Sequence, residues 1–223
     1  MKKFIFKNYK MTNFKFILFL CFSLSHLNNN FIKIVGSLTN NNNNNKFECL
    51  IENNRYPLEY LYATLSRRSN QNNVFTYQPT KIDDIKTFGW TLIGLKDKSA
   101  NDLFYMKNIE TKEYLCSENK FEKKFNVLST FDKKRLVHTW SVDEKKEKYG
   151  HFELSKECVW RFERAEPDSN VFLIWNHFYN EPLYAGTYLF KQARNKRNVY
   201  LRNKTIKTDE FKWIVTDCLI LKM

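Results

Sequence analysis

Short segments that alternate between hydrophobic and polar residues fill most of the chain. They recur from about residue 47 to residue 218, and they are rich in Phe, Tyr, Val and Trp. A period of two in residues that favour extended backbone predicts β-strands. No segment sustains a helical period with capping residues at its ends. The pattern therefore predicts an all-β domain.

One set of these segments recurs along the chain. The block 104–115 (FYMKNIETKEYL) matches the block 172–183 (FLIWNHFYNEPL) without a gap, and a weaker copy begins at residue 50. Each copy is followed by the tripeptide Asn-Val-apolar, at 73–75, 126–128 and 198–200. Further along, each copy reaches a tryptophan at the start of another alternating segment. These tryptophans are Trp90, Trp160 and Trp213. Trp140 competes with Trp160 in the middle copy, but the distance from Trp160 to the following block agrees better with the distance after Trp90.

Four strands in each of three copies give twelve short strands, which is typical of a β-trefoil with three four-stranded repeats and pseudo-threefold symmetry. One such unit cannot bury its apolar face alone, whereas three units close a barrel and cover their strand edges. We predict a single β-trefoil domain over 47–223. A Lys- and Glu-rich insertion near 132–157 is expected to form a surface hairpin. A β-sandwich with similar hairpins is the alternative.

The first 46 residues differ in character from the rest of the chain. Five lysines and no acidic residue precede a ten-residue apolar run at 16–25. This pattern predicts a secretory signal peptide over 1–25, and the Asn-rich stretch 26–46 predicts a flexible leader. No apolar run approaches the ~20 residues of a membrane-spanning helix. We therefore expect a secreted, extracellular protein.

Four cysteines follow the signal segment, an even number in the oxidising compartment that secretion implies: Cys49, Cys116, Cys158 and Cys218. Sequence alone does not choose among the three possible connectivities. In a β-trefoil the first and last strands pair, which would bring Cys49 near Cys218. Cys116 and Cys158, both in the middle repeat, would then form the second disulfide.

The blocks 104–115 and 172–183 resemble the C-terminal β-trefoil of the insect 30-kDa haemolymph lipoproteins, which share the pattern apolar-x-Ile-x-Asn-x-x-Tyr-x-x-x-Leu. The resemblance covers about residues 47–218. It implies an abundant secreted protein of insect body fluid, with a storage or defence role and sugars or lipids as ligands. The N-terminal helical domain of that family has no counterpart here, so its function does not carry over. The Gln-x-Trp signature of ricin-type lectins is absent.

The distribution of charged residues along the chain indicates a candidate binding surface. The chain carries 37 Lys and Arg against 24 Asp and Glu, a formal net charge of +13. In the third repeat seven cations occur between residues 191 and 207 with no acidic residue among them: Lys191, Arg194, Lys196, Arg197, Arg202, Lys204 and Lys207. Such a patch predicts an acidic polysaccharide or another extracellular polyanion as partner, and not genomic DNA. A solvated loop explains the pattern equally well. Asn203 begins a glycosylation sequon within it.

Other functions of the same fold stay open. A lectin-like trefoil would stack exposed aromatic residues on sugar, with Trp175, Phe178 and Tyr179 as candidates. A protease inhibitor would present the 132–157 insertion to a protein partner, and a storage protein would need no specific ligand. We expect no enzymatic activity, metal or cofactor, because the sequence has no catalytic, phosphate-binding or metal-binding motif. Two repeated sets are expected to support hairpin turns: Glu59, Glu113 and Glu181, and Asn54, Asn108 and Asn176.

Overall fold

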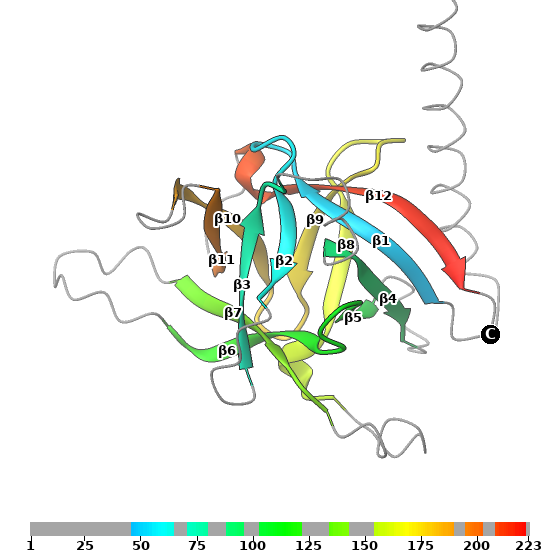
Figure 1. The fold of residues 1–223 in the computed structure, drawn as a ribbon, viewed down its shortest axis with the longest axis vertical. Helices are drawn as coiled ribbons and strands as arrows, with labels where there is room; N and C mark the ends of the chain where they lie inside the picture. Colours follow the sequence, from blue (N-terminus) through cyan, green and yellow to red (C-terminus); the bar gives the residue numbers. More distant parts are fainter. Residues whose placement is uncertain are drawn as a thin grey trace, which may run out of the picture.

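The computed structural model describes residues 46–64, 71–79, 88–95, 103–121, 134–142, 154–189, 195–202 and 208–221. The predicted signal peptide and leader, apart from Lys46, lie outside these ranges. The described residues form twelve β-strands (Figure 1): β1 (Lys46–Asn53), β2 (Tyr60–Ala63), β3 (Gln71–Tyr77), β4 (Trp90–Gly94), β5 (Leu103–Asn108), β6 (Tyr114–Phe121), β7 (Lys134–Trp140), β8 (Trp160–Arg164), β9 (Val171–Asn176), β10 (Glu181–Leu189), β11 (Lys196–Arg202) and β12 (Lys212–Leu221). Two short 3-10 turns, η2 (Lys156–Cys158) and η3 (Asp209–Phe211), precede β8 and β12.

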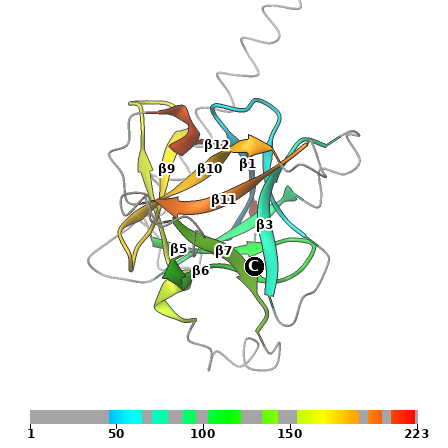
Figure 2. The same cartoon turned by 90° about the vertical axis from the view of Figure 1, so that its left-hand side faces the viewer.

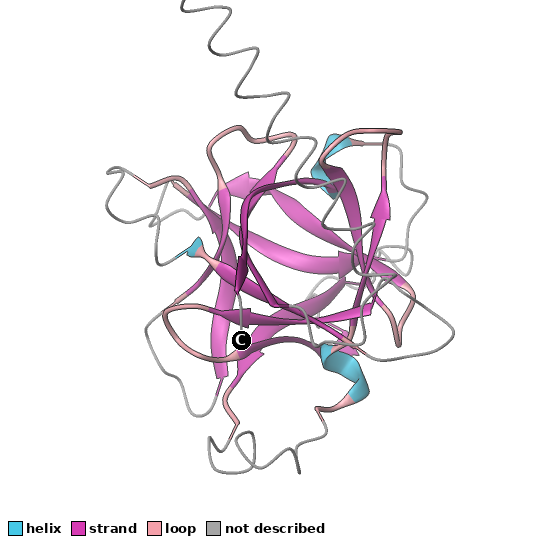
Figure 3. Cartoon of the chain, turned by 90° about the vertical axis from the view of Figure 1, so that its right-hand side faces the viewer, coloured by secondary structure: helices cyan, strands magenta, loops and turns pink. Residues whose placement is uncertain are grey.

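Six strands close a ring through antiparallel pairing. Around the ring β1 pairs with β12, β12 with β9, β9 with β8, β8 with β5, β5 with β4, and β4 with β1. Figure 3 views the molecule from the right-hand side of Figure 1, where β1, β4 and β12 lie. A closed ring has no unpaired edge among its members, which removes a common route to aggregation.

The other six strands form three antiparallel pairs, β2–β3, β6–β7 and β10–β11. Their strands β3, β7 and β11 also pair with one another, and Figure 2 looks onto this arrangement, here called the cap. A six-stranded barrel with a cap of three strand pairs is a β-trefoil. The all-β fold class predicted from alternation is therefore confirmed.

Three fully buried tryptophans link the barrel to the cap: Trp90, Trp160 and Trp213. Each indole N–H donates to a backbone carbonyl of a cap strand, namely those of Leu61 (3.0 Å), Leu115 (2.8 Å) and Leu183 (3.1 Å). The large rings fill the core while their single polar atom stays satisfied. Trp160 belongs to this buried set, as the sequence favoured, whereas Trp140 lies on β7 with 42% of its surface exposed.

The middle set of strands differs from the sequence-based expectation. Strand β7 lies inside the stretch 132–157, and Val137 joins the core at the ladder position that Val74 and Val199 occupy in β3 and β11. The prediction of a surface hairpin is therefore wrong for 134–140. This segment is a strand of the cap, and alternate residues of the strand point inward. The tripeptide at 126–128 and the remaining stretch 143–153 lie outside the described residues.

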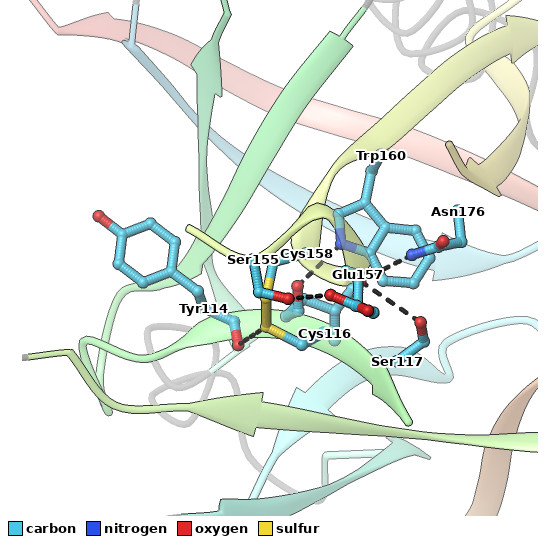
Figure 4. Close-up of a disulfide and its surroundings, with 9 residues drawn as sticks. Tyr114, Cys116, Ser117, Ser155, Glu157, Cys158, Trp160 and Asn176 are labelled. Carbon is cyan, nitrogen blue, oxygen red and sulfur yellow. Dashed lines mark hydrogen bonds between the residues drawn. A yellow bond between two sulfur atoms is a disulfide. The ribbon is translucent and has the colours of Figure 1, made fainter. Parts of the chain in front are cut away.

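Both expected disulfides are present. Cys49 bonds to Cys218 across β1 and β12, and Cys116 of β6 bonds to Cys158 of η2. Figure 4 shows the second bond close to Asn176, whose side-chain amide donates to the carbonyl of Glu157 at 2.8 Å. Two disulfides are compatible with an extracellular protein. In the described part of the chain, no helix has the length and apolar character needed to cross a membrane.

Candidate functional site

Residues of β11 alternate between the two faces of the cap. Val199 and Leu201 are buried in the core, so Arg197 points inward with them. Lys196 and Arg202 are in the opposite phase and belong to the outer face. The predicted basic patch is therefore split between an interior residue and two residues of the surface.

Arg197 forms an interior ion pair. Its Nε donates to both carboxylate oxygens of Glu59 at 3.0 Å, and the two side chains are only 13% and 9% exposed. The hydroxyl of Thr76 donates to the same carboxylate at 2.6 Å, and the ring of Tyr56 lies 3.7 Å from the guanidinium carbon. These contacts correct the placement of Arg197 in an open patch, since a buried carboxylate holds it.

A second Arg–Glu pair occupies the corresponding place between β7 and β10. Arg135 Nε donates to Glu181 at 2.8 Å, and the ring of Tyr179 lies 3.9 Å from the guanidinium carbon. Burial raises the pKa of the Glu181 carboxyl, and the charge and hydrogen bond of Arg135 oppose that rise. Tyr179 therefore lies against a cation, so this predicted sugar-stacking ring serves a packing role.

The third glutamate, Glu113, is bound by neutral side chains in place of an arginine. The side-chain amide of Asn72 donates to Glu113 at 2.7 Å, and the hydroxyl of Thr139 donates to the same carboxylate oxygen. Within the described ranges no cation forms an ion pair with Glu113. The three glutamates therefore do more than support turns, because each holds neighbouring cap strands together.

Three fully buried asparagines fix the turns after β1, β5 and β9: Asn53, Asn108 and Asn176. Their side-chain amides donate to the carbonyls of Glu210, Gly89 and Glu157, and their side-chain oxygens accept backbone N–H groups of the turn. The role predicted for Asn108 and Asn176 is confirmed. In the first copy the residue is Asn53 and not Asn54, because that turn is one residue longer.

Two cations face each other on the outer face of the cap. Arg202 of β11 and Lys134 of β7 are direct partners in the ladder between these strands. Lys134 Nζ lies 5.2 Å from the ring centre of Tyr200 and 5.8 Å from that of Tyr184, and Arg202 lies 5.0 Å from the latter. Like charges directly opposite each other repel, and the ring faces of the two tyrosines attract both cations. An anion bound between the two cations would lower that repulsion.

The two tyrosines beneath these cations are held in place. The hydroxyl of Tyr184 is 2.7 Å from that of Thr187, and the hydroxyl of Tyr200 accepts the side-chain amide of Asn198 at 2.7 Å. A Cβ on Gly186 would lie 3.0 Å from the carbonyl oxygen of Asn198 and 3.3 Å from the ring of Tyr200. Glycine thus allows the close approach that seats this ring.

The remaining members of the predicted patch divide into two groups. Lys196 lies over the rings of Tyr62 and Tyr77, at 5.5 and 5.2 Å from their centres. The others lie outside the described residues: Lys191, Arg194, Asn203, Lys204 and Lys207. Lys134 was missed by sequence reasoning because only the pairing of β7 with β11 brings it to Arg202. We define the outer cap face by Lys134, Tyr184, Lys196, Tyr200 and Arg202.

The three aromatic residues predicted to stack on sugar, Trp175, Phe178 and Tyr179, do not form one exposed surface. Trp175 is half-buried on β9, with the guanidinium of Arg161 5.4 Å from its ring centre. Phe178 is 42% exposed, and Lys156 Nζ lies 3.7 Å from its ring centre. Since Tyr179 lies against Arg135, Phe178 is the candidate ring of this set with the most open surface.

His138, buried on β7, makes the stability of the cap depend on pH. Burial lowers its pKa to about 4, against about 6.5 in an unfolded chain. Between these values the unfolded chain binds more protons, so this contribution to stability is complete above pH ~6.5 and is lost towards pH ~4. We expect His138→Gln to remove about 2 kcal/mol of the stability lost between pH 7 and pH 4.5, measured by urea unfolding.

The exposed His177 supplies the control for this measurement. His177→Gln makes the same substitution at an exposed position, and the stability that this variant loses between pH 7 and pH 4.5 is compared with the loss in the parent protein. A His138→Gln variant that loses as much stability on acidification as the parent would contradict the assignment.

Comparison with known proteins supports the fold. No protein-family model matches the chain, and no curated protein sequence matches it. Among solved structures, ThreeFoil, a designed threefold-symmetric protein, aligns with a TM-score of 0.52 at 14% identity, over 76% of this chain and 98% of that one. An SDF2-like protein from Arabidopsis thaliana aligns with a TM-score of 0.57 at 8% identity, over 80% of this chain and 96% of that one.

A Caenorhabditis elegans protein of unknown function aligns with a TM-score of 0.54 at 15% identity, over 76% of this chain and 92% of that one. Identities this low show a shared β-trefoil fold and do not transfer a function. The resemblance to insect haemolymph lipoproteins stays a prediction.

Proposed function

We propose that this protein is a secreted, non-enzymatic β-trefoil that binds an acidic polymer or an acidic surface through the outer cap face. The observation that supports this proposal is the direct opposition of Lys134 and Arg202 over two fixed tyrosine rings. An anionic group placed between the two cations would gain charge-assisted hydrogen bonds and would relieve their repulsion. Removal of the predicted signal peptide with its five lysines lowers the formal net charge from +13 to +8, and this positive charge would attract a polyanion from a distance.

The sequence around the cation pair supports a ligand longer than one anionic group. Lys196 lies at the other end of β11, roughly 20 Å from Arg202 at ~3.3 Å per residue. The segments on either side of β11 contain further cations: Lys191, Arg194, Lys204 and Lys207. A polymer with repeated negative charge would engage several of these sites at once, whereas a single small anion would engage one.

We also propose that the domain consists of three four-stranded repeats with pseudo-threefold symmetry. The matching hydrogen bonds of Trp90, Trp160 and Trp213 support this proposal. The resemblance to haemolymph lipoproteins and the apolar run at 16–25 support secretion. The exposed ring of Phe178 favours the lectin-like alternative, in which sugar stacks away from the cation pair.

The proposal predicts salt-dependent retention on immobilised heparin. We expect Lys134→Ser with Arg202→Ser to lower the salt concentration of elution and to reduce the slope of log affinity against log salt by about 2. The matched control is Arg55→Ser with Lys156→Ser, which removes one Arg and one Lys from exposed positions elsewhere. The control should elute close to the parent protein.

Two results would contradict the proposal. Equal shifts in both double variants would mean that net charge alone governs retention. Elution of the parent protein at low salt would mean that the cation pair is an ordinary solvated surface.

A further inference from the structure

One exposed aromatic ring shares the outer face of β7 with the cation pair. Trp140 is 42% exposed at the end of β7 and is in phase with Lys134, six residues earlier on the same strand. At ~3.3 Å per residue the two positions are roughly 20 Å apart. The same face of β7 thus carries a cation at one end and an exposed indole at the other, with the half-buried Leu136 and the buried His138 between them.

The neighbours of Trp140 that reach the surface are polar. Its ladder partner on β6, Tyr114, is buried in a small apolar cluster, and the Nζ of Lys107 lies 5.2 Å from the centre of the Tyr114 ring. The ring of His138 lies 6.3 Å away, and the exposed Asn73 is the partner of His138 on β3. A protein-binding hot spot is normally a contiguous apolar patch, which these neighbours do not form. A lone indole beside an amide and a cation suits a ligand that is apolar on one face and rich in hydroxyl groups at its rim.

We infer that the acidic polymer is an acidic polysaccharide, and that it lies along β7 with one sugar ring stacked on Trp140. This inference rests on the proposed function, because Lys134 and Arg202 supply the contacts to sulfate or carboxylate groups. A pyranose ring has an apolar C–H face that packs on the indole. Its hydroxyl groups reach the side-chain amide of Asn73, which can both donate and accept hydrogen bonds.

Two other polyanions fit this face less well. Inorganic polyphosphate has the charge but no ring to place on Trp140. A single-stranded nucleic acid has rings, but its general binding sites offer aromatic side chains to successive bases along a charged groove. Among the described residues of the β7 outer face, Trp140 is the one exposed aromatic ring.

The test compares three probes on the full chain: heparin, inorganic polyphosphate and an oligothymidylate. We expect Trp140→Ala to weaken heparin binding about three- to tenfold and to leave polyphosphate binding unchanged. Trp140→Phe should restore most of the loss, because it keeps an aromatic face. Lys134→Ser with Arg202→Ser should weaken the binding of all three probes. Phe178→Ala is the matched control, since Phe178 is also 42% exposed, and it should bind heparin like the parent protein.

The outcomes separate this inference from the proposed function. If Trp140→Ala leaves heparin binding unchanged while the cation double variant weakens it, the stacking inference is overturned and the proposed function stands. If Phe178→Ala weakens heparin binding instead, the sugar lies at the β9–β10 turn. If Trp140→Ala weakens oligothymidylate more than heparin, the ligand is a nucleic acid. If the parent protein binds none of the probes, both proposals fall. Because Trp140 is exposed, its variants should keep the parent melting temperature, which thermal unfolding checks.

Discussion

Replacing Cys49 and Cys218 by alanine will lower the free energy of unfolding by about 4–5 kcal/mol, the largest change we expect from removing one covalent link. The two cysteines are 169 residues apart in the sequence. Cross-linking residues so distant removes many conformations from the unfolded chain, and the loop-entropy model gives about 5 kcal/mol for this length. The bond also joins β1 to β12, the pair that closes the barrel. Urea unfolding without reductant measures the change.

The second disulfide provides an internal comparison. Cys116 and Cys158 are 42 residues apart, for which the same model gives about 4 kcal/mol. Alanine at both positions should therefore destabilise the protein slightly less than the first pair of substitutions. A larger loss from Cys116→Ala with Cys158→Ala would show that local packing outweighs loop length, and would contradict the entropic explanation.

Arg197→Met will destabilise the protein by about 3–5 kcal/mol, because it leaves the carboxylate of Glu59 buried without its cation. The arginine itself contributes less than this figure suggests, since much of the loss is the cost of an unpaired charge. Glu59→Gln combined with Arg197→Met should therefore recover most of the lost stability. Urea unfolding of the parent, the single variant and the double variant measures both effects.

Arg202→Met is the control on the same strand. Arg202 belongs to the outer face, where substitutions usually change stability by less than about 0.5 kcal/mol. Equal losses at Arg197 and Arg202 would contradict the division of β11 into inner and outer residues. Arg197 should accordingly be left unchanged in any variant designed to test binding.

Much of the architecture follows from the sequence because it depends on large or covalently constrained side chains. Trp90, Trp160 and Trp213 open alternating segments, and an indole this large has few places in a small domain other than the core. The disulfide pairing followed from the expectation that the first and last strands are neighbours. These features depend on the order of the strands along the chain. A repeated sequence pattern shows that order, so the features could be predicted.

The candidate site was harder to predict because it depends on pairing between distant strands. The alternation of Arg197 with Val199 and Leu201 was a usable signal that this arginine points inward, but the high local density of cations obscured it. No local signal connects Lys134 with Arg202, since the register of β7 against β11 alone makes them partners. Strand β7 was missed for a related reason, because its Lys and Arg residues give it the composition of a surface loop.

The pairing of β1 with β12 also determines how the domain would respond to mechanical force. Lys46 and Leu221 are partners in that ladder, and three residues further along each strand the chain reaches Cys49 and Cys218. A pull applied to the chain before Lys46 and after Leu221 would separate these few residues one pair at a time. The load would then pass through the sulfur–sulfur bond and bypass residues 50–217. The cap and its outer face would carry no tension, so the oxidised domain would transmit force without being stretched.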